Sequence, residues 1–424
     1  MLGHFDMEAL ETAIRSSMHH VGGVMLEKLI NSDGGDYRGV SILCSCKGKA
    51  EFVEYRDKGV TTMLSPVNVK RAYYHCSGCG RGQLPKDNDL DIVRTSFSPG
   101  VRRMMGRVGS KESFDEGRKD LEVLAGISVV TKEVERVSEC IGGQIEVYGL
   151  KERELVFSGK VVPIKSTPKM YVAIDGTGVP VVKSESAGRK GKGLDGEART
   201  REVKLGCVFT QTKVDDKGHP VRDGDSTTYV GAIENAEEFG PRIYAEAARR
   251  GVEWAGKVVV LGDGAIWIWN LAEEHFYGAI QIVDLYHARE HLWSTGKLLY
   301  GFNTTKTKGW VRDRCFELDD GDIEALLKAM EQLRPEAEDA QDKVLKEIGY
   351  FERNAERMRY KSFKDQGLFV GSGVVEAGCK TVIGARLKQS GMRWTVRGAN
   401  AIISLRCCFL SGRWEDFWEN RTTG

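Results

Sequence analysis

Three carboxylates stand where a protein could use them for metal chemistry. Asp175 follows the apolar run Tyr171–Ile174, and Asp263 follows a second apolar run, Val258–Leu261. Each acid is followed by a glycine, which is typical of a buried strand that ends at a turn. Glu376 lies near the start of an expected helix, among small residues. Because ligand sites in open α/β sheets lie at the carboxyl ends of strands, the two aspartates are expected to share one site.

Two strand aspartates and one helix glutamate suit a pair of Mg²⁺ or Mn²⁺ ions about 3.5–4 Å apart. Such a pair generates a nucleophile from water or a 3′-hydroxyl and stabilises the leaving oxygen of an in-line displacement at phosphorus. Each acid also has a plainer interpretation. Asp175 or Asp263 alone could cap a turn or helix, and Glu376 could interact with a helix dipole. The ordered set of three favours nuclease or strand-transfer chemistry.

Basic residues flank these acids and predict contacts to a nucleic-acid backbone. The stretch Ala377–Arg413 contains seven basic residues and no acid, and Gly188–Lys204 is a second, glycine-rich basic segment. Phosphate contacts of this kind hold DNA without reading its sequence. The residues predicted to contact DNA from these two segments are Arg189, Lys190, Lys192, Arg199, Arg201, Lys380, Arg386, Lys388, Arg393 and Arg397.

Two early cysteine pairs predict a structural zinc site. Cys44 and Cys46 lie about thirty residues before Cys76 and Cys79, and both pairs lie near glycines. Two such knuckles supply the four thiolates of a tetrahedral zinc ion, which leaves no open position for catalysis. The C-x-C spacing of the first pair is one residue tighter than the usual C-x-x-C. His75 could therefore replace one thiolate, and ordinary cysteines in a small β unit are the alternative.

A helix-turn-helix is predicted between Leu121 and Gly142. Gly126 supplies the turn, and Ser128 is the expected N-cap of the second helix. Lys132 and Arg136 would then lie near the start of a DNA-reading helix. Any α-hairpin with a glycine turn is the alternative.

The composition is that of an ordinary globular protein. The 424 residues are 41% hydrophobic and 29% charged, and 62 basic residues nearly balance 61 acidic ones. Net charge therefore indicates no polyanionic partner by itself. We expect no signal peptide and no membrane span, since apolar runs of 18 residues are absent. The ten unevenly spaced cysteines favour a reducing cytoplasm.

The periodicity predicts which elements carry the acids. Residues 6–31 have helical spacing with a break at Gly22-Gly23, and residues 36–90 are β-rich. From residue 168 the pattern is α/β, with strands expected in MYVAID, VKLGCVFT, TTYVGAIE, KVVVLGD and IQIVD. Helices are expected at 236–251 and 286–300, and across 316–360. Ser372 is the expected N-cap of one long helix that carries Glu376.

These segments together resemble the DDE transposases of bacterial insertion sequences, specifically the ISKra family. The resemblance covers nearly the whole chain and includes AIDGTGVP, GRKGKGLDGEARTREVKLGCVFTQT, VLGDGAIWIWN, IQIVDLYHAREHLW and GSGVVEAGCKTVIGARLKQSGMRWT. It implies an RNase H-like core, a mixed five-stranded sheet with helices. The family's catalytic triad falls on Asp175, Asp263 and Glu376. The segment DLYH also resembles a motif associated with such sites, so Asp284 and His287 are possible accessory residues; an N-cap and a surface histidine are the alternative.

The resulting organisation has five parts. Residues 1–35 form an N-terminal helical segment, 36–90 a zinc-ribbon-like unit, and 91–150 a helix-turn-helix region. An RNase H-like α/β core spans 165–285 and 366–424, and an all-α insertion spans 286–365. The expected activity is metal-dependent cleavage and transfer of double-stranded DNA, at transposon ends and target, by a homodimer or higher oligomer. The expected location is the bacterial cytoplasm, at the nucleoid.

Other functions fit the residues less well. A haloacid-dehalogenase-type phosphatase needs a nucleophilic acid at position 173, which is alanine. An actin-like sugar kinase needs a second phosphate loop, and none is found. His287 and His291 lack the glutamate of H-E-x-x-H, which excludes a zinc protease of that type. A domesticated or regulatory DNA-binding protein without catalysis is the remaining alternative.

Overall fold

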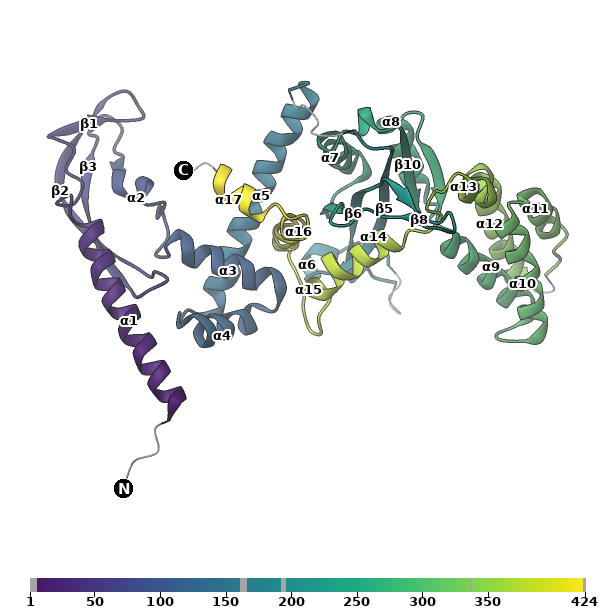
Figure 1. Cartoon of the computed structure of the whole chain (residues 1–424), viewed down its shortest axis with the longest axis horizontal. Coiled ribbons are helices and arrows are strands. Elements are labelled where there is room, and N and C mark those ends of the chain that lie inside the picture. The colour runs from purple at the N-terminus through teal and green to yellow at the C-terminus, as the bar shows by residue number, and fades with distance from the viewer. Residues whose placement is uncertain (1–5, 161–165, 192–195, 336–337, 422–424) are drawn as a thin grey trace. The chain divides into compact units, whose positions relative to one another are not determined.

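The computed structural model describes residues 6–160, 166–191, 196–335 and 338–421. The chain divides into two compact units, which are described separately (Figure 1). The first comprises residues 1–141 and 416–424, and the second comprises residues 142–415. The sequence analysis places residues 142–150 in the DNA-binding region and residues 416–424 in the core. In the structure, 142–150 belong to the second unit and 416–424 to the first. Among the described residues, no helix is long and apolar enough to cross a membrane.

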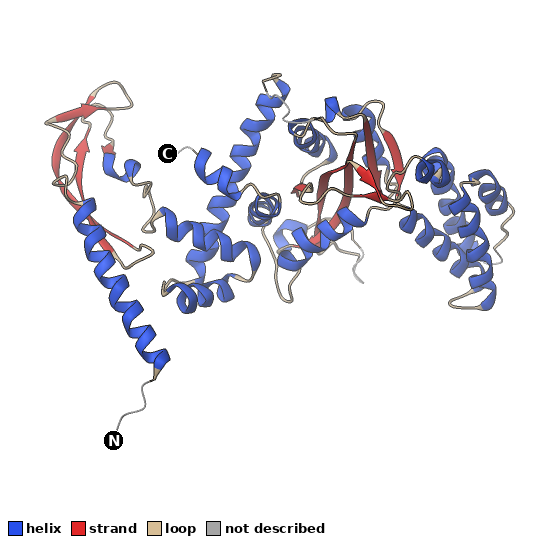
Figure 2. Ribbon diagram, viewed as in Figure 1, coloured by secondary structure: helices blue, strands red, loops and turns tan. Residues whose placement is uncertain are grey.

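The first unit combines one long helix, a small antiparallel sheet and a group of short helices (Figure 2). Its sheet has the order β1-β2-β3-β4. The strands are β1 (Ser41–Leu43), β2 (Lys49–Val60), β3 (Val67–His75) and β4 (Gly82–Gln83). The helices are α1 (Met7–Ile30), α2 (Pro85–Asp89), α3 (Pro99–Lys111) and α4 (Phe114–Ala125). The β-rich character expected of residues 36–90 is confirmed.

Helix α1 is continuous, so the break expected at Gly22-Gly23 is wrong. A side chain at Gly23 would place its Cβ 1.8 Å from the hydroxyl of Ser65. The glycine therefore permits close packing rather than ending the helix. Leu26 and Ile30 of the same helix pack against a cluster of buried apolar side chains beneath it. That cluster consists of Val60, Val67, Val69 and Ile92.

The second unit is built on a mixed five-stranded sheet of order β11-β10-β5-β6-β9. The strands are β5 (Lys169–Pro180), β6 (Thr200–Gln211), β9 (Thr228–Ala232), β10 (Lys257–Gly262) and β11 (Ile280–Val283), with a separate hairpin of β7 (Lys213–Val214) and β8 (Pro220–Val221). Strand β6 is antiparallel to β5 and β9, whereas β10 is parallel to β5 and β11. All five predicted strands are confirmed. Their order and directions fit the RNase H-like core that the resemblance implies.

Helices cover both faces of this sheet. Gly206 of β6 faces α7 (Ala236–Arg249), because a Cβ there would meet Ile243 and Phe239. The preceding residue, Leu205, points to the opposite face. There it contacts Gly378, at the end of α14 (Gly373–Gly378). Helix α16 (Val396–Leu410) packs along β9.

The remaining elements of this unit are mostly helical. They are α6 (Lys183–Ser186), η1 (Val252–Trp254), α8 (Ile266–His275), α9 (Leu285–Tyr300), α10 (Thr305–Asp320), α11 (Ile323–Glu331), α12 (Glu338–Asn354), η2 (Ala355–Met358) and α13 (Tyr360–Asp365). After α14 come a π-helical segment, η3 (Cys379–Gly384), and α15 (Ala385–Leu387). The sequence predicts one regular helix there, whereas the structure has an α-helical, a π-helical and a second α-helical segment in succession.

Two helices cross the boundary between the units: α5 (Thr131–Phe157) and α17 (Trp414–Asn420). Within the second unit, the C-terminal part of α5 is held by ion pairs. Arg242 of α7 binds Glu146 at 2.8 Å and Glu234 at 2.7 Å. Burial alone would raise the pKa of Glu146, but the hydrogen bonds and charges of Arg242 and Arg153 lower it to about 2. The carboxylate therefore remains charged and continues to bind α7 in mildly acidic solution.

Gly142 and Gly143 of α5 provide a matched test of this packing. A Cβ at Gly142 would lie 2.0 Å from the carbonyl oxygen of Ala401, whereas a Cβ at Gly143 meets nothing within 4 Å. We expect Gly142→Ala to lower the free energy of unfolding by about 1–3 kcal/mol, because the backbones must separate. We expect Gly143→Ala to raise it by up to about 1 kcal/mol through helix propensity. Urea denaturation of both variants measures the difference, and equal effects would contradict the packing.

Candidate functional site

Asp175 and Asp263 come together at the edge of the sheet. The parallel register pairs Val260 with Val172 and Leu261 with Ala173. Continued by two residues, this register brings Asp263 level with Asp175 on the neighbouring strand. Neighbouring strands lie about 4.8 Å apart, so the two carboxylates influence each other directly. Both residues are half-buried.

The Asp175 carboxylate is surrounded by hydrogen-bond donors. Its Oδ1 accepts from the Gly176 amide at 2.7 Å, and its Oδ2 accepts from the Cys379 thiol at 3.3 Å. Burial raises the pKa of Asp175, and the negative charge of Asp263 raises it further. The thiol, the amide and the charge of His287 act in the opposite direction. A cation bound between the two aspartates would relieve the same repulsion.

Helix α14 places Glu376 above this edge of the sheet. Asp175 pairs with Leu205 of β6, and Leu205 faces α14, so Asp175 points toward the same helix. Glu376 lies one helical turn before Cys379, and residues three apart share a helix face. The side chain of Glu376 is exposed, and its Oε1 accepts from the hydroxyl of Ser372 at 3.3 Å. Ser372 makes no side-chain cap to the helix, although it occupies the N-cap position.

The three carboxylates do not form a tight cluster. Among the described residues, only a group of four cysteines brings three or more possible metal ligands within 4.8 Å of one another. The hard oxygens of Asp175, Asp263 and Glu376 are nevertheless the ligand type that Mg²⁺ and Mn²⁺ prefer. Two ions about 3.5–4 Å apart need a wider set of ligands than one ion does.

Asp284 is the N-cap of a helix, which is the alternative role considered for it in the sequence. The carboxylate is buried, caps α9 by accepting from the His287 amide at 2.6 Å, and also accepts from the Ser372 amide. It thereby ties the start of α9 to the residue that precedes α14. His287 is half-buried, and its imidazole lies 3.6 Å from the exposed carboxylate of Glu290.

The insertion contributes a residue that the sequence gave no reason to select. The hydroxyl of Tyr350, on α12, donates to the backbone carbonyl of Asp263 at 2.9 Å. Its ring covers Gly264, where a Cβ would lie 2.5 Å from it. The ring also stacks on His291 at 3.8 Å, and His291 binds Glu347 at 2.6 Å. Cys379 was also missed, although its position three residues after Glu376 is a usable signal.

The predicted DNA-binding residues of the second unit divide into three groups. Arg189, Lys190, Arg199, Lys380, Lys388, Arg393 and Arg397 are exposed, and Arg201 is half-buried. Lys388 donates to the hydroxyl of Thr177 at 2.6 Å, two residues from Asp175. The prediction that Arg386 contacts DNA is wrong. Its side chain is fully buried, with the guanidinium over the ring of Trp394. Lys192 lies outside the described residues.

The predicted helix-turn-helix corresponds to α4, a turn at Gly126, and α5. Gly126 has a left-handed φ of 68° and ends α4, as expected. The second helix begins at Thr131, and the carbonyl of Val130 accepts its first hydrogen bonds, so Ser128 is not the N-cap. Val130 itself is exposed. Lys132 and Arg136 are exposed, but each is paired with an acid of the same helix, Glu135 and Glu133 respectively.

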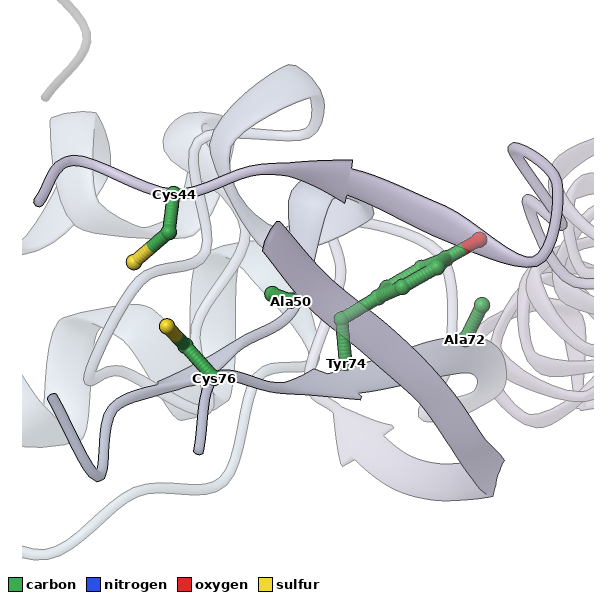
Figure 3. Packing of buried hydrophobic residues seen from close by; sticks show 5 residues of the cluster. All are labelled: Cys44, Ala50, Ala72, Tyr74 and Cys76. Carbon is green, nitrogen blue, oxygen red and sulfur yellow. The ribbon is translucent and has the colours of Figure 1, made fainter. Parts of the chain in front are cut away.

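Four cysteines converge at one end of the small sheet of the first unit. Cys44 and Cys79 lie 3.6 Å apart between sulfur atoms, as do Cys46 and Cys76. Zn–S bonds of about 2.3 Å in a tetrahedron give sulfur–sulfur distances of about 3.8 Å, so the cluster could bind zinc. Figure 3 shows the sulfur atoms of Cys44 and Cys76 turned toward each other. His75, the alternative ligand, is exposed and outside the cluster.

Tight turns explain why this C-x-C spacing still converges. Lys47 adopts a left-handed φ of 67°, and the Cys44 amide donates to the carbonyl of Gly48 at 2.8 Å. Gly80, with a φ of 69°, closes the second turn. The pKa of the Cys44 thiol is lowered to about 6, first by the hydrogen bond from the Cys46 amide and then by neighbouring thiols. The thiolate form, which binds metal, is thereby favoured.

Comparison with known proteins yields one distant relative. It is the UPF0236 protein in vanSb 3'region of Streptococcus gallolyticus, 23% identical over 379 residues, which cover 87% of this chain and 76% of that protein. No family model matches the chain. Among solved structures, the Drosophila P element transposase strand transfer complex aligns over 75% of this chain and 80% of its own chain, with 10% identity. The TM-score of that alignment is 0.25.

We expect the cysteine cluster to bind one zinc ion per chain. Replacing Cys76 by serine removes a ligand, so zinc binding should fall by about an order of magnitude or more, and the small sheet should unfold. Cys140→Ser is the control, because Cys140 is an exposed cysteine outside the cluster. Native mass spectrometry measures the zinc content. Zinc absent from the unmodified chain after expression in zinc-supplemented medium would contradict the assignment.

We expect Tyr350→Phe to loosen the turn that carries Asp263. Loss of one buried hydrogen bond should lower the free energy of unfolding by roughly 1 kcal/mol. Hydrogen exchange should become faster at the Gly264 and Ala265 amides, which lie in that turn. Tyr286→Phe is the control, since Tyr286 is exposed. If the Tyr350→Phe variant exchanges these amides at the same rate as the unmodified chain, the hydroxyl of Tyr350 does not hold the turn.

Proposed function

We propose that this chain is a DDE transposase of an insertion sequence, related to the ISKra family. It binds the terminal inverted repeats of its element and catalyses DNA strand cleavage and strand transfer. One observation carries the proposal. Acids lie on the first strand, after the fourth strand and on a late helix of a mixed five-stranded sheet, the order that the resemblance implies.

Asp175, Asp263 and Glu376 are the proposed ligands of two Mg²⁺ or Mn²⁺ ions. Ions held there would activate the attacking hydroxyl and stabilise the leaving oxygen in an in-line displacement at phosphorus. The fit is supported by the chemistry of the donors: three carboxylates, two of them close enough to repel each other. Asp284 and His287 are proposed as positioning residues, since Asp284 holds the loop that leads to α14.

Basic side chains near the acids are proposed to hold the DNA backbone. Lys388 is the strongest candidate, because its ammonium group binds Thr177, which lies two residues after Asp175 on the same strand. Arg393 and Arg397 are exposed farther along the same basic stretch, and Arg189 and Lys190 lie in the second. Lys132 and Arg136 are proposed to act in the first unit, where a zinc-ribbon-like sheet and helices α4 and α5 would recognise the element ends. Both ends must be joined in one complex, so a dimer or larger assembly on the bacterial nucleoid is proposed.

An excision assay in cells tests the proposal. The DNA flanks of this gene are placed around a marker, the protein is supplied in trans, and marker loss and reinsertion are scored. We expect excision with the unmodified chain and only background levels with Asp175→Asn, Asp263→Asn and Glu376→Gln. Each change removes a metal ligand while it keeps the size of the side chain.

Glu237→Gln is the matched control, since Glu237 is an exposed acid on α7 and should retain full excision. DNA binding by all variants is measured in parallel to show that they fold. Calorimetric titration with Mn²⁺ gives a readout besides activity, and binding should be lost with each triad change. If the triad variants excise as well as the unmodified chain, catalysis at this site is refuted. If no protein excises but all bind DNA, the regulatory alternative is favoured.

A further inference from the structure

Helix α1 carries an apolar face that the described residues of its own unit leave uncovered. Besides Val24, seven large apolar side chains along the helix are between 44 and 70% exposed. They are Met7, Leu10, Ile14, Met18, Val21, Met25 and Leu29. We call this set the α1 stripe. A contiguous apolar surface of this kind marks an interaction site.

The stripe is separate from the face with which α1 packs on its own unit. Leu26 and Ile30 contact the buried cluster under the helix, and Gly23 packs against Ser65. At 100° per residue, these three positions lie about 60° or more outside the stripe. Helix α1 therefore has two apolar faces, and its own unit uses only one of them.

The spacing of the stripe is regular and suits a straight helix. Met7, Met18 and Leu29 are eleven residues apart, as are Leu10 and Val21, and Ile14 and Met25. An eleven-residue repeat corresponds to about 3.67 residues per turn, so the stripe stays on one side of the helix. Helices with such a repeat pack along their whole length. The 24 residues of α1 give a seam about 36 Å long.

We propose that the α1 stripe pairs with the same stripe of a second copy of this chain, with the two helices antiparallel. The two ends of the stripe are placed symmetrically about Met18, because Met7 and Leu29 lie eleven residues on either side of it. A two-fold axis at Met18 therefore sets Met7 of each helix against Leu29 of the other, as a self-complementary interface requires. Two such stripes bury on the order of 1,000 Å² of apolar surface, near the lower limit for a specific dimer.

The charges at the ends of α1 favour the antiparallel arrangement. The exposed Glu8 lies in the first turn and the exposed Lys28 in the last turn. An antiparallel copy brings each Lys28 to the level of Glu8 in the partner and opposes the two helix dipoles. A parallel copy would bring like charges together at both ends. This inference concerns self-association and does not depend on the proposed activity.

Sedimentation velocity of the full chain without DNA tests the pairing. We expect a dimer at micromolar concentrations. Met18→Glu places two like charges at the two-fold axis, so it should weaken the dimer by about a hundredfold or more. Ser16→Glu is the matched control, because Ser16 is exposed on the opposite side of the helix and its variant should dimerise as the unmodified chain does. A monomeric unmodified chain, or a Met18→Glu variant that dimerises normally, would overturn the proposal.

Cysteine cross-linking tests the direction of the helices. Under mild oxidation, a mixture of Met7→Cys and Leu29→Cys proteins should form more covalent dimer than either variant alone or the unmodified chain. Cross-linking of Met7→Cys alone above that background would overturn the antiparallel arrangement. Neither experiment uses DNA or catalysis. A failed excision assay with an intact dimer would therefore refute the proposed function alone, and the reverse result would refute the pairing alone.

Discussion

The second unit depends on one electrostatic constraint: the sheet sets two carboxylates side by side. The register of β10 against β5, continued past its last pair Leu261–Ala173, brings Asp263 level with Asp175. Surrounding groups reduce the repulsion but do not remove it. The Gly176 amide and the Cys379 thiol donate to Asp175, and the Ala265 amide donates to Asp263 at 2.9 Å. These are dipoles or weak donors, so they leave the negative charge in place. A proton or a bound cation would relieve it, and the raised pKa of Asp175 and the hard carboxylate oxygens are the two expressions of this one constraint.

A second constraint follows from the long excursion of the chain between β11 and α14. Helices α9 to α13 leave the sheet and return to it, so the distance between Asp263 and Glu376 is set by how the two ends of this segment meet. Asp284 joins these ends, because one buried carboxylate accepts from the amides of His287 and Ser372. A change of length inside the helical segment would leave this junction intact. The Tyr350 hydroxyl adds a second connection, from α12 to the Asp263 turn.

The sequence predicted those features that depend on local pattern. The apolar runs before Asp175 and Asp263 became buried parallel neighbours, because continuous apolar runs predict strands covered on both faces. Features that depend on packing between distant segments were not predictable. Arg386 belongs to a basic stretch, yet tertiary contacts bury it under Trp394. Gly22-Gly23 has the composition of a helix break, but Ser65 lies against Gly23 and the helix continues. Tyr350 lies 87 residues from Asp263, and no spacing rule connects them.

The first unit has little apolar core at the cysteine end of its sheet. The cluster at the cysteine end of its sheet contains only five buried residues, Cys44, Ala50, Ala72, Tyr74 and Cys76. Two of these are cysteines, so the core at this end is completed by the atoms that would bind metal. A core this small does not hold a sheet by apolar burial alone, and a metal cross-link between the four cysteines would supply the missing constraint. The same reasoning applies to α1. Its packed face covers one apolar cluster, while the α1 stripe remains in water, where it contributes nothing to stability. A second copy that covers the stripe would convert this exposed surface into a core shared by two chains.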